Sequence, residues 1–230
     1  MTKRNLLNRT LVAAASCLLM ASASAVPVAW TDWTSISSAS ATGTMGGVGV
    51  TVTAAGTFGM NGVSQIGCGT NFWTQPNVLD LPYTGGTVSN APTACEQVGL
   101  SSPVSITVTF ASAVNTLYMA LLSVGQAGLE VTYDFNQAFS IDSEGAGFFG
   151  NDTTNGLLGS GDTLRMREFH GVLLFSAPVL SLSFTTTPPE FWHAFSFGQA
   201  AARVPEPGTL ALVAAALLGA GALTRRRRLA

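Results

Sequence analysis

Two histidines occur in the chain, and each has a glutamate close by. Glu168 and His170 belong to the stretch REFHG, and Glu190 and His193 belong to EFWHAF. Residues two apart on a β-strand point to the same side, so Glu168 and His170 could work as a general acid–base pair. Catalysis would also require a cleft that brings the pair to a substrate.

The alternative is that these histidines are structural. On a strand, His193 shares a face with Phe191, Phe195 and Phe197, and it would then pack in the core. The chain also lacks a G-x-S-x-G, an H-E-x-x-H, a P-loop and a G-x-G-x-x-G that opens a helix. We therefore predict that the protein is not an enzyme and has no catalytic residues.

Carboxylates gather in one glycine-rich segment, IDSEGAGFFGNDTTNGLLGSGD. Calcium binds six to eight oxygens from carboxylates and carbonyls, and glycines allow the tight loops of such a site. The spacing matches neither an EF-hand nor a nonapeptide repeat, so solvated acids that keep the domain soluble are the alternative. Calcium is the one candidate cofactor, and its candidate ligands are Asp142, Glu144, Asp152 and Asp162.

Tryptophan is the residue type that could stack on sugar rings if its side chains are exposed, although it more often packs in a core. Trp73 is the best candidate for an exposed platform, since it follows Asn71 and Phe72 in the expected long loop 70–102. The four tryptophans are Trp30, Trp33, Trp73 and Trp192.

Most of the body alternates apolar and polar residues with period two, which predicts strands with one buried face. VLSLSF, for example, places Leu180, Leu182 and Phe184 on one face and Ser181 and Ser183 on the other. Clusters of Gly, Pro, Asn and Asp separate the strands, so we predict an all-β fold, an antiparallel β-sandwich that is jelly-roll-like. Strands are expected at 47–54, 104–110, 114–124, 129–135, 179–184 and 191–197, with 114–124 central because it is apolar on both faces.

The N-terminus has the features of a signal peptide. Lys3, Arg4 and Arg9 precede a short apolar run, Leu11–Ala21, and the small-residue site ASA follows at once, so maturation would start after residue 25. An uncleaved anchor is the alternative, and the shortness of the run argues against it.

The two cysteines that remain after export are an even pair in an oxidising compartment. A disulfide between Cys68 and Cys95 would contribute about 3–4 kcal/mol. Two free buried thiols are the alternative, and neither cysteine has a histidine or a second cysteine nearby for a metal site.

The C-terminus combines two prolines, an uncharged run and four arginines. Gly208–Thr224 has 17 residues without a charge, and as a helix it would cover about 25 Å, at the short limit for a bilayer. Pro205 and Pro207 prevent the helix from extending backwards. The arginine run 225–228 would stay cytoplasmic, so the body lies outside the inner membrane.

These features resemble the PEP-CTERM sorting signal of Gram-negative bacteria over Val204–Ala230, with VPEPGTLAL, a Leu/Ala/Gly span and RRRR in the same order. In that family an exosortase, a membrane-embedded cysteine-type transpeptidase, recognises Pro-Glu-Pro, cleaves there and sends the protein toward the envelope surface or a polysaccharide matrix. The resemblance implies a sorting motif at Pro205, Glu206 and Pro207, and stop-transfer charges at Arg225, Arg226, Arg227 and Arg228.

Processing changes the charge of the protein. The body 26–204 keeps three arginines and eleven of the twelve acids, so its formal charge is −8 against −2 for the whole chain. Such a body is a poor nucleic-acid binder, because phosphate contacts need clustered Lys and Arg.

We therefore expect an exported, surface- or matrix-associated structural protein that is anchored transiently in the inner membrane. The expected partners are an exosortase, the secretion machinery and extracellular polysaccharide, and not nucleic acid. A carbohydrate- or calcium-binding surface module is the alternative. The expected organisation is a signal peptide at 1–25, a β-sandwich at 26–199, a linker at 200–207, a transmembrane helix at 208–224 and a basic tail at 225–230.

Overall fold

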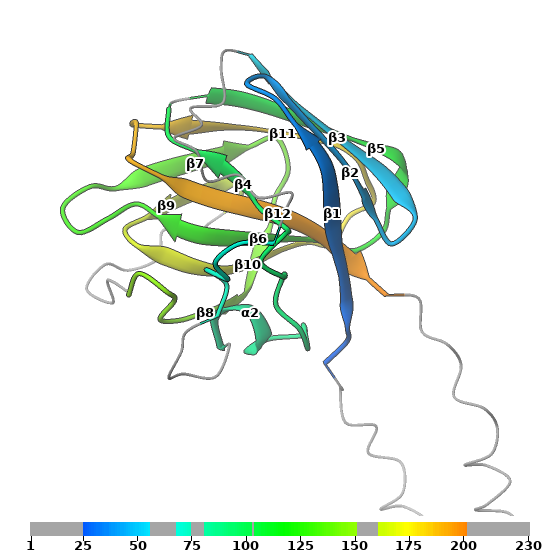
Figure 1. The fold of residues 1–230 in the computed structure, drawn as a ribbon, viewed down its shortest axis with the longest axis horizontal. Coiled ribbons are helices and arrows are strands. Elements are labelled where there is room, and N and C mark those ends of the chain that lie inside the picture. Colours follow the sequence, from blue (N-terminus) through cyan, green and yellow to red (C-terminus); the bar gives the residue numbers. More distant parts are fainter. Residues whose placement is uncertain (1–24, 56–67, 75–80, 103, 151–160, 202–230) are drawn as a thin grey trace, which may run out of the picture. The chain divides into compact units, whose positions relative to one another are not determined.

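The structure is a computed structural model, and it describes residues 25–55, 68–74, 81–102, 104–150 and 161–201. The chain divides into two compact units, Met1–Ala200 and Ala201–Ala230, and almost all described residues belong to the first. The described residues of that unit form twelve strands and one short helix (Figure 1). The elements are β1 Val28–Ile36, β2 Ser40–Met45, β3 Val48–Ala55, α2 Leu81–Thr84, β4 Val98–Leu100, β5 Val104–Val114, β6 Leu117–Val124, β7 Val131–Phe135, β8 Ser140–Glu144, β9 Thr163–Met166, β10 Phe169–Phe175, β11 Val179–Thr187 and β12 His193–Ala200.

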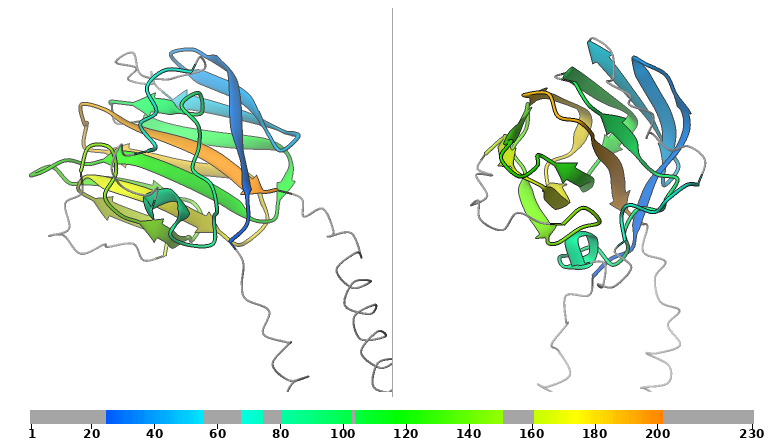
Figure 2. Two further views of the ribbon diagram at one scale, coloured as in Figure 1. Left: turned by 60° about the horizontal axis from the view of Figure 1, so that its bottom comes forward. Right: turned by 60° about the vertical axis from the view of Figure 1, so that its left-hand side comes forward.

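All named strands join one antiparallel sheet in the order β8-β10-β6-β12-β1-β2-β3-β5-β11-β7-β9, with β4 paired to β12. The sheet is strongly curled into a half-barrel, as the turned views of Figure 2 show. Strand β1 continues the sheet around the curl, because Val28–Trp30 pairs with β12 and Thr31–Ile36 pairs with β2. The predicted all-β antiparallel fold is confirmed. In place of the two separate sheets of the predicted jelly-roll-like sandwich, the described strands form one continuous curled sheet.

The main core lies between the two halves of the curled sheet. Phe110 on β5 meets Phe197 on β12 with ring centroids 6.1 Å apart, and Phe135 on β7 meets Phe175 on β10 at 5.4 Å. The predicted alternation explains this packing, since β5 buries every second residue along Val104–Phe110. The apolar faces of both halves are thereby removed from water.

A second, smaller core covers the outer face of the β6–β10–β12 half. Every residue of β6 is buried, so this strand has no solvent-facing side, as its sequence predicts. Trp30, Trp73, Tyr83 and Trp192 pack on this outer face together with apolar side chains of the strands. The cover comes from α2 and from the segment 68–74, which Figure 1 shows next to these strands.

Two predicted side-chain positions are wrong. Leu180 was expected on the buried face of β11, yet it is 56% exposed, because the pairing with β5 shifts register between Val179 and Ser181. Phe191 was expected on the core face with His193, yet it is 78% exposed, because β12 begins only at His193. His193 itself is buried, as the structural interpretation of this histidine predicts.

The expected loop 70–102 contains the helix α2 and the strand β4 in its described part. The predicted disulfide between Cys68 and Cys95 is present. In the described ranges no helix is long and apolar enough to cross a bilayer. The expected signal peptide, the transmembrane helix 208–224 and the basic tail lie outside the described residues, apart from Ala25.

Phe197→Ala should lower the free energy of unfolding by about 3–5 kcal/mol, because the ring fills the space between the sheet halves and would leave a cavity. Leu180→Ala is the control, since its side chain is largely exposed and should change stability by less than about 0.5 kcal/mol. Urea denaturation of both variants measures the difference. Equal losses of unfolding free energy in the two variants would contradict the placement of Phe197 in the core.

Candidate functional site

A pocket of about 300 Å³ opens at one end of the β6–β10–β12 half of the sheet. It is built where the β6–β7, β9–β10 and β11–β12 connections meet the segments 68–74 and 147–150. Gly147 lets the last of these segments lie close, because a Cβ at this position would come within 2.1 Å of the His170 ring. The pocket therefore gathers residues that are far apart in the sequence.

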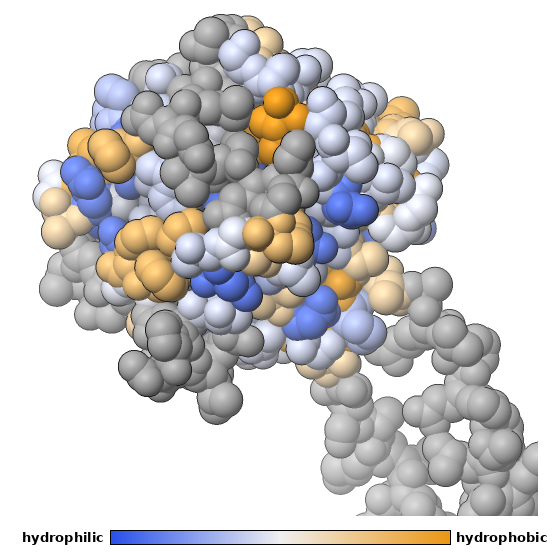
Figure 3. Space-filling model, viewed as in Figure 1, coloured by the Kyte–Doolittle hydropathy of each residue, from blue (hydrophilic) through white to orange (hydrophobic). Residues whose placement is uncertain are grey.

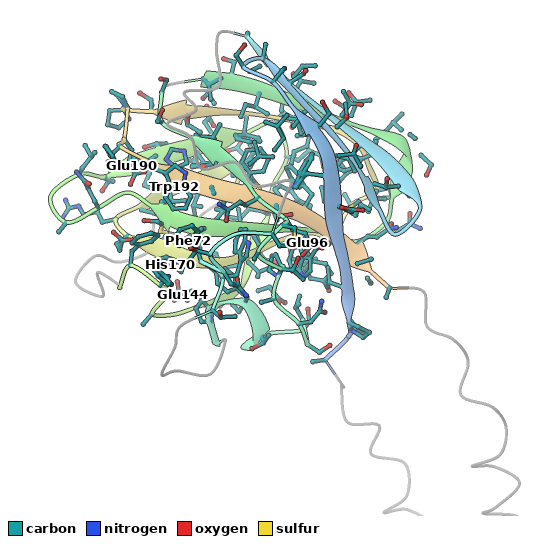
Figure 4. All side chains as sticks on the ribbon, viewed as in Figure 1. Phe72, Glu96, Glu144, His170, Glu190 and Trp192 are labelled. Atoms are coloured by element: carbon teal, nitrogen blue, oxygen red, sulfur yellow. A yellow bond between two sulfur atoms is a disulfide. The ribbon has the colours of Figure 1, made fainter. Side chains whose placement is uncertain are left out.

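Aromatic side chains form the walls of this pocket. The rings of Phe72 and Phe149 stack with centroids 5.6 Å apart and an interplanar angle of 22°. Trp192 contacts both, at 5.6 Å from Phe72 and 5.7 Å from Phe149. Phe191 completes the walls and is the most exposed large apolar side chain of the described residues. Figure 3 shows apolar surface on the same side of the domain on which Figure 4 labels Phe72 and Trp192.

The polar lining includes Glu168, whose carboxylate receives two hydrogen bonds on Oε1. Ser123 Oγ donates to it at 2.7 Å, and His170 Nε2 donates to it at 3.2 Å. Because a carboxylate only accepts, the hydrogen of His170 that faces Glu168 lies on Nε2. The other ring nitrogen, Nδ1, then accepts from the Tyr83 hydroxyl at 3.2 Å. Tyr83, His170 and Ser123 thus orient the Glu168 carboxylate.

Tyr83 remains a hydrogen-bond donor over a wide pH range. Burial raises the pKa of its hydroxyl well above the usual value, and the negative charge of Glu168 raises it further. The bond to His170 Nδ1 is therefore maintained by a neutral phenol.

Glu190 is the second carboxylate of the pocket, and it is more deeply buried. Its Oε2 accepts from the backbone amide of Gly125 at 2.8 Å and from His193 Nδ1 at 2.8 Å. Burial raises the pKa of Tyr133 well above the usual value, and the charge of Glu190 adds to this rise. The Tyr133 ring lies edge-on to His193 at 5.6 Å. The negative charge of Glu190 therefore acts on a residue of the main core.

Two residues of the pocket have strained backbones. Ser123 has φ of 54° and Glu168 has φ of 48°, in the left-handed region that residues other than glycine rarely adopt. The strain coincides with a bulge, because Leu122 and Ser123 of β6 stand opposite the single residue His170 of β10. Strained residues and bulges cluster at functional sites, where they re-aim side chains.

Two buried polar atoms beside the pocket have no hydrogen-bond partner among the described residues. They are the indole nitrogen Nε1 of Trp192 and the ring nitrogen Nε2 of His193. A buried polar group without a partner costs free energy, so such atoms call for an explanation at the site where they occur. Trp192 lines the pocket itself.

The structure divides the predicted site residues into two groups. Glu168 and Glu190 line the pocket, and each bonds to the histidine that the sequence suggested as its partner. The expectation that Trp73 is exposed is wrong: its side chain is 1% exposed and packs edge-on against Tyr83 at 5.2 Å. Trp73 is buried because it belongs to the segment 68–74, which packs with α2 on the apolar outer face of the sheet.

The described candidates for a calcium site do not come together. Asp142 accepts hydrogen bonds from the amide and the hydroxyl of Thr87, at 2.9 Å and 2.6 Å, which fixes the chain after α2. Asp162 lies in the turn before β9 and accepts from Thr163 Oγ1 at 3.3 Å. Across the described ranges, no group of three or more His, Cys, Asp or Glu side chains could hold a metal ion. Asp152 lies outside the described residues.

The sequence interpretation missed five residues of the pocket. Phe191 was expected in the core. Phe72 was noted only as a neighbour of Trp73, and Ser123, Gln126 and Phe149 were not considered as site residues. The stretch SVGQAG around Ser123 carries one signal, since a Gly-rich turn directly after an apolar central strand marks a sheet end where side chains become accessible. Phe149 offers a weaker signal as an aromatic residue among glycines.

Comparison with known proteins finds a family match at the C-terminus. Residues 203–228 match the PEP-CTERM protein-sorting motif, so the chain carries this motif at its C-terminus. The motif implies processing by an exosortase and export with sorting to the cell surface. Neither the curated proteins nor the solved structures give a match to the chain.

Ser123→Gly should be more stable than Ser123→Ala by about 1 kcal/mol. Both variants lose the bond to Glu168, but glycine also relieves the left-handed backbone. In the extended strand β5, Ser105→Gly and Ser105→Ala form the matched control and should show the reverse order. Urea denaturation of the four variants gives the order of stability of Gly and Ala at each position. Alanine proving the more stable residue at position 123 would argue against the strained backbone.

The mature protein should lack Arg225–Arg228, because an exosortase removes the C-terminal signal. Mass spectrometry of the protein from a host with an exosortase checks this expectation. Glu206→Ala, and expression in a host without the enzyme, should each leave the arginines attached. Arginine-free protein in the host without an exosortase would assign the cleavage to another protease.

Proposed function

We propose that this protein is a non-enzymatic, surface- or matrix-associated protein whose β-domain binds carbohydrate in the aromatic pocket. One observation carries the proposal: four aromatic side chains surround a concave site whose polar lining includes Ser123, Gln126, Glu168 and Glu190. The sorting motif at the C-terminus supplies the location, since it implies export to the cell surface. Binding to extracellular polysaccharide would then hold the protein in a matrix.

The combination of residue types supports a saccharide as the ligand. A pyranose ring has apolar C–H faces that stack on aromatic rings, and its rim carries hydroxyl groups. Carboxylates accept hydrogen bonds from such hydroxyls, while the side-chain amide of Gln126 can both donate and accept. A cavity of about 300 Å³ is at the small end of ligand pockets, which suits a short segment of a glycan chain.

The hydrogen bonds around the pocket support binding rather than hydrolysis. Glycoside hydrolysis needs two carboxylates that both reach the bond to be cleaved, but the Glu190 side chain is 2% exposed and its Oε2 already accepts from Gly125 and His193. His170 is fully buried between Tyr83 and Glu168, and His193 is held by Glu190. We therefore assign both histidines to orienting the carboxylates.

Phe191→Ala in the exported protein should weaken binding to the preferred oligosaccharide of a glycan array by about tenfold, because it removes the most accessible stacking surface. Leu180→Ala is the matched control, since it removes an exposed apolar side chain from a different part of the sheet. Calorimetric titration gives the two affinities. Neither side chain belongs to the core, so both variants should retain the wild-type melting temperature.

Two outcomes would contradict the proposal. One is the absence of saturable binding to any glycan on the array. The other is the release of new reducing ends from the bound oligosaccharide, which would make the protein a hydrolase.

A further inference from the structure

We propose that the pocket prefers an amino sugar. Glu168 accepts a hydrogen bond from the protonated amine, and the aromatic walls cover the sugar ring. This inference rests on the proposed carbohydrate-binding function and adds the chemical class of the ligand. It follows from the charge of the pocket, from the accessibility of its two carboxylates and from the nature of its walls.

The pocket is negatively charged by composition. Of the described residues that line it, two are glutamates and none is Arg or Lys. Arg167 precedes Glu168 in the β9–β10 turn but does not line the pocket, and Arg165 pairs with Glu130 at 2.6 Å. Sugar hydroxyls can also donate to carboxylates, but only a ligand with a positive charge is attracted by the net negative charge.

The two carboxylates differ in what they can contact. The Glu190 side chain is 2% exposed and its Oε2 is occupied by Gly125 and His193, so it contributes charge rather than direct contact. The Glu168 side chain is 16% exposed, which leaves part of it accessible from the pocket. Its position is fixed by Ser123 and by His170, which is held in turn by Tyr83. Glu168 is therefore the carboxylate that an amine of the ligand would contact.

The walls favour the same class of ligand. The face of an aromatic ring carries negative potential and attracts cations, and tryptophan does so most strongly. Phe72, Phe149 and Trp192 lie within 6 Å of one another by their ring centroids, so they form one continuous aromatic surface.

The charge of the whole body acts in the same direction. Three arginines against eleven acids remain between residues 26 and 204, which gives a formal charge of −8. A polycationic glycan chain would be attracted to such a body before any specific contact forms. A chain of acidic sugars would be repelled.

The test compares three oligosaccharides of equal length with the exported protein: glucosamine, N-acetylglucosamine and glucose oligomers, at a pH at which the amine is protonated. We expect the glucosamine oligomer to bind about tenfold more tightly than the other two, because it alone offers a cation for Glu168. Added salt should reduce this preference. Tetramethylammonium is included as a cation without a sugar ring and should bind far more weakly than the glucosamine oligomer.

Glu168→Gln should reduce the preference for the glucosamine oligomer at least fivefold, because it removes the charge and keeps the shape of the side chain. Glu130→Gln is the matched control: it removes one acid of the same type outside the pocket, and its exposed ion pair contributes little to stability. Wild-type preference should persist in Glu130→Gln. Melting temperatures establish that both variants are folded.

The outcomes separate the inference from the function on which it rests. Equal binding of all three oligosaccharides would overturn the amino-sugar assignment and leave carbohydrate binding intact. Equally tight binding of tetramethylammonium would also overturn it, since the sugar ring would then contribute nothing. An unchanged preference in Glu168→Gln would remove Glu168 from the assignment. Binding of none of the oligosaccharides would overturn both proposals.

Discussion

The structure depends on burying both faces of three neighbouring strands. β6, β10 and β12 are apolar on the inner face, where they meet the other half of the curled sheet, and on the outer face, where Trp73 and Tyr83 cover them. A sheet that is apolar on both sides must be covered on both sides. The curl supplies the inner cover, and the described segments 68–74 and 81–91 contribute to the outer one. The pocket opens where the strands end and both covers meet the connecting turns.

The buried histidines at that end of the sheet are stabilised by pairing with carboxylates. His170 and His193 are fully or almost fully buried, and each has a carboxylate within hydrogen-bond distance. The bulge at Ser123 and the left-handed backbone of Glu168 bring this network to the wall of the pocket. Conformational strain and buried charge both reduce stability, so their coincidence with an aromatic cavity is the reason for assigning the function to this place.

The C-terminal motif and the β-domain have different roles. The C-terminal motif determines where the protein is sent, and the β-domain carries the site that we propose for a ligand. An aromatic pocket with carboxylates fits a protein that is exported to a surface, because glycans are abundant there and water competes strongly with purely polar contacts. The sorting signal alone does not specify this chemistry.

The sequence by itself indicated the class of fold, the C-terminal sorting motif and the possible disulfide, because each depends on local pattern: alternation along VSITVTF, the order of Pro-Glu-Pro, apolar span and arginines, and an even cysteine count. It also paired Glu168 with His170, two residues apart on the chain. Only the tertiary structure decided that Trp73 is buried while Phe191 is exposed, and that the strands form one curled sheet. Those features depend on which distant segments cover a face and on where a strand begins, and no local pattern contains that information.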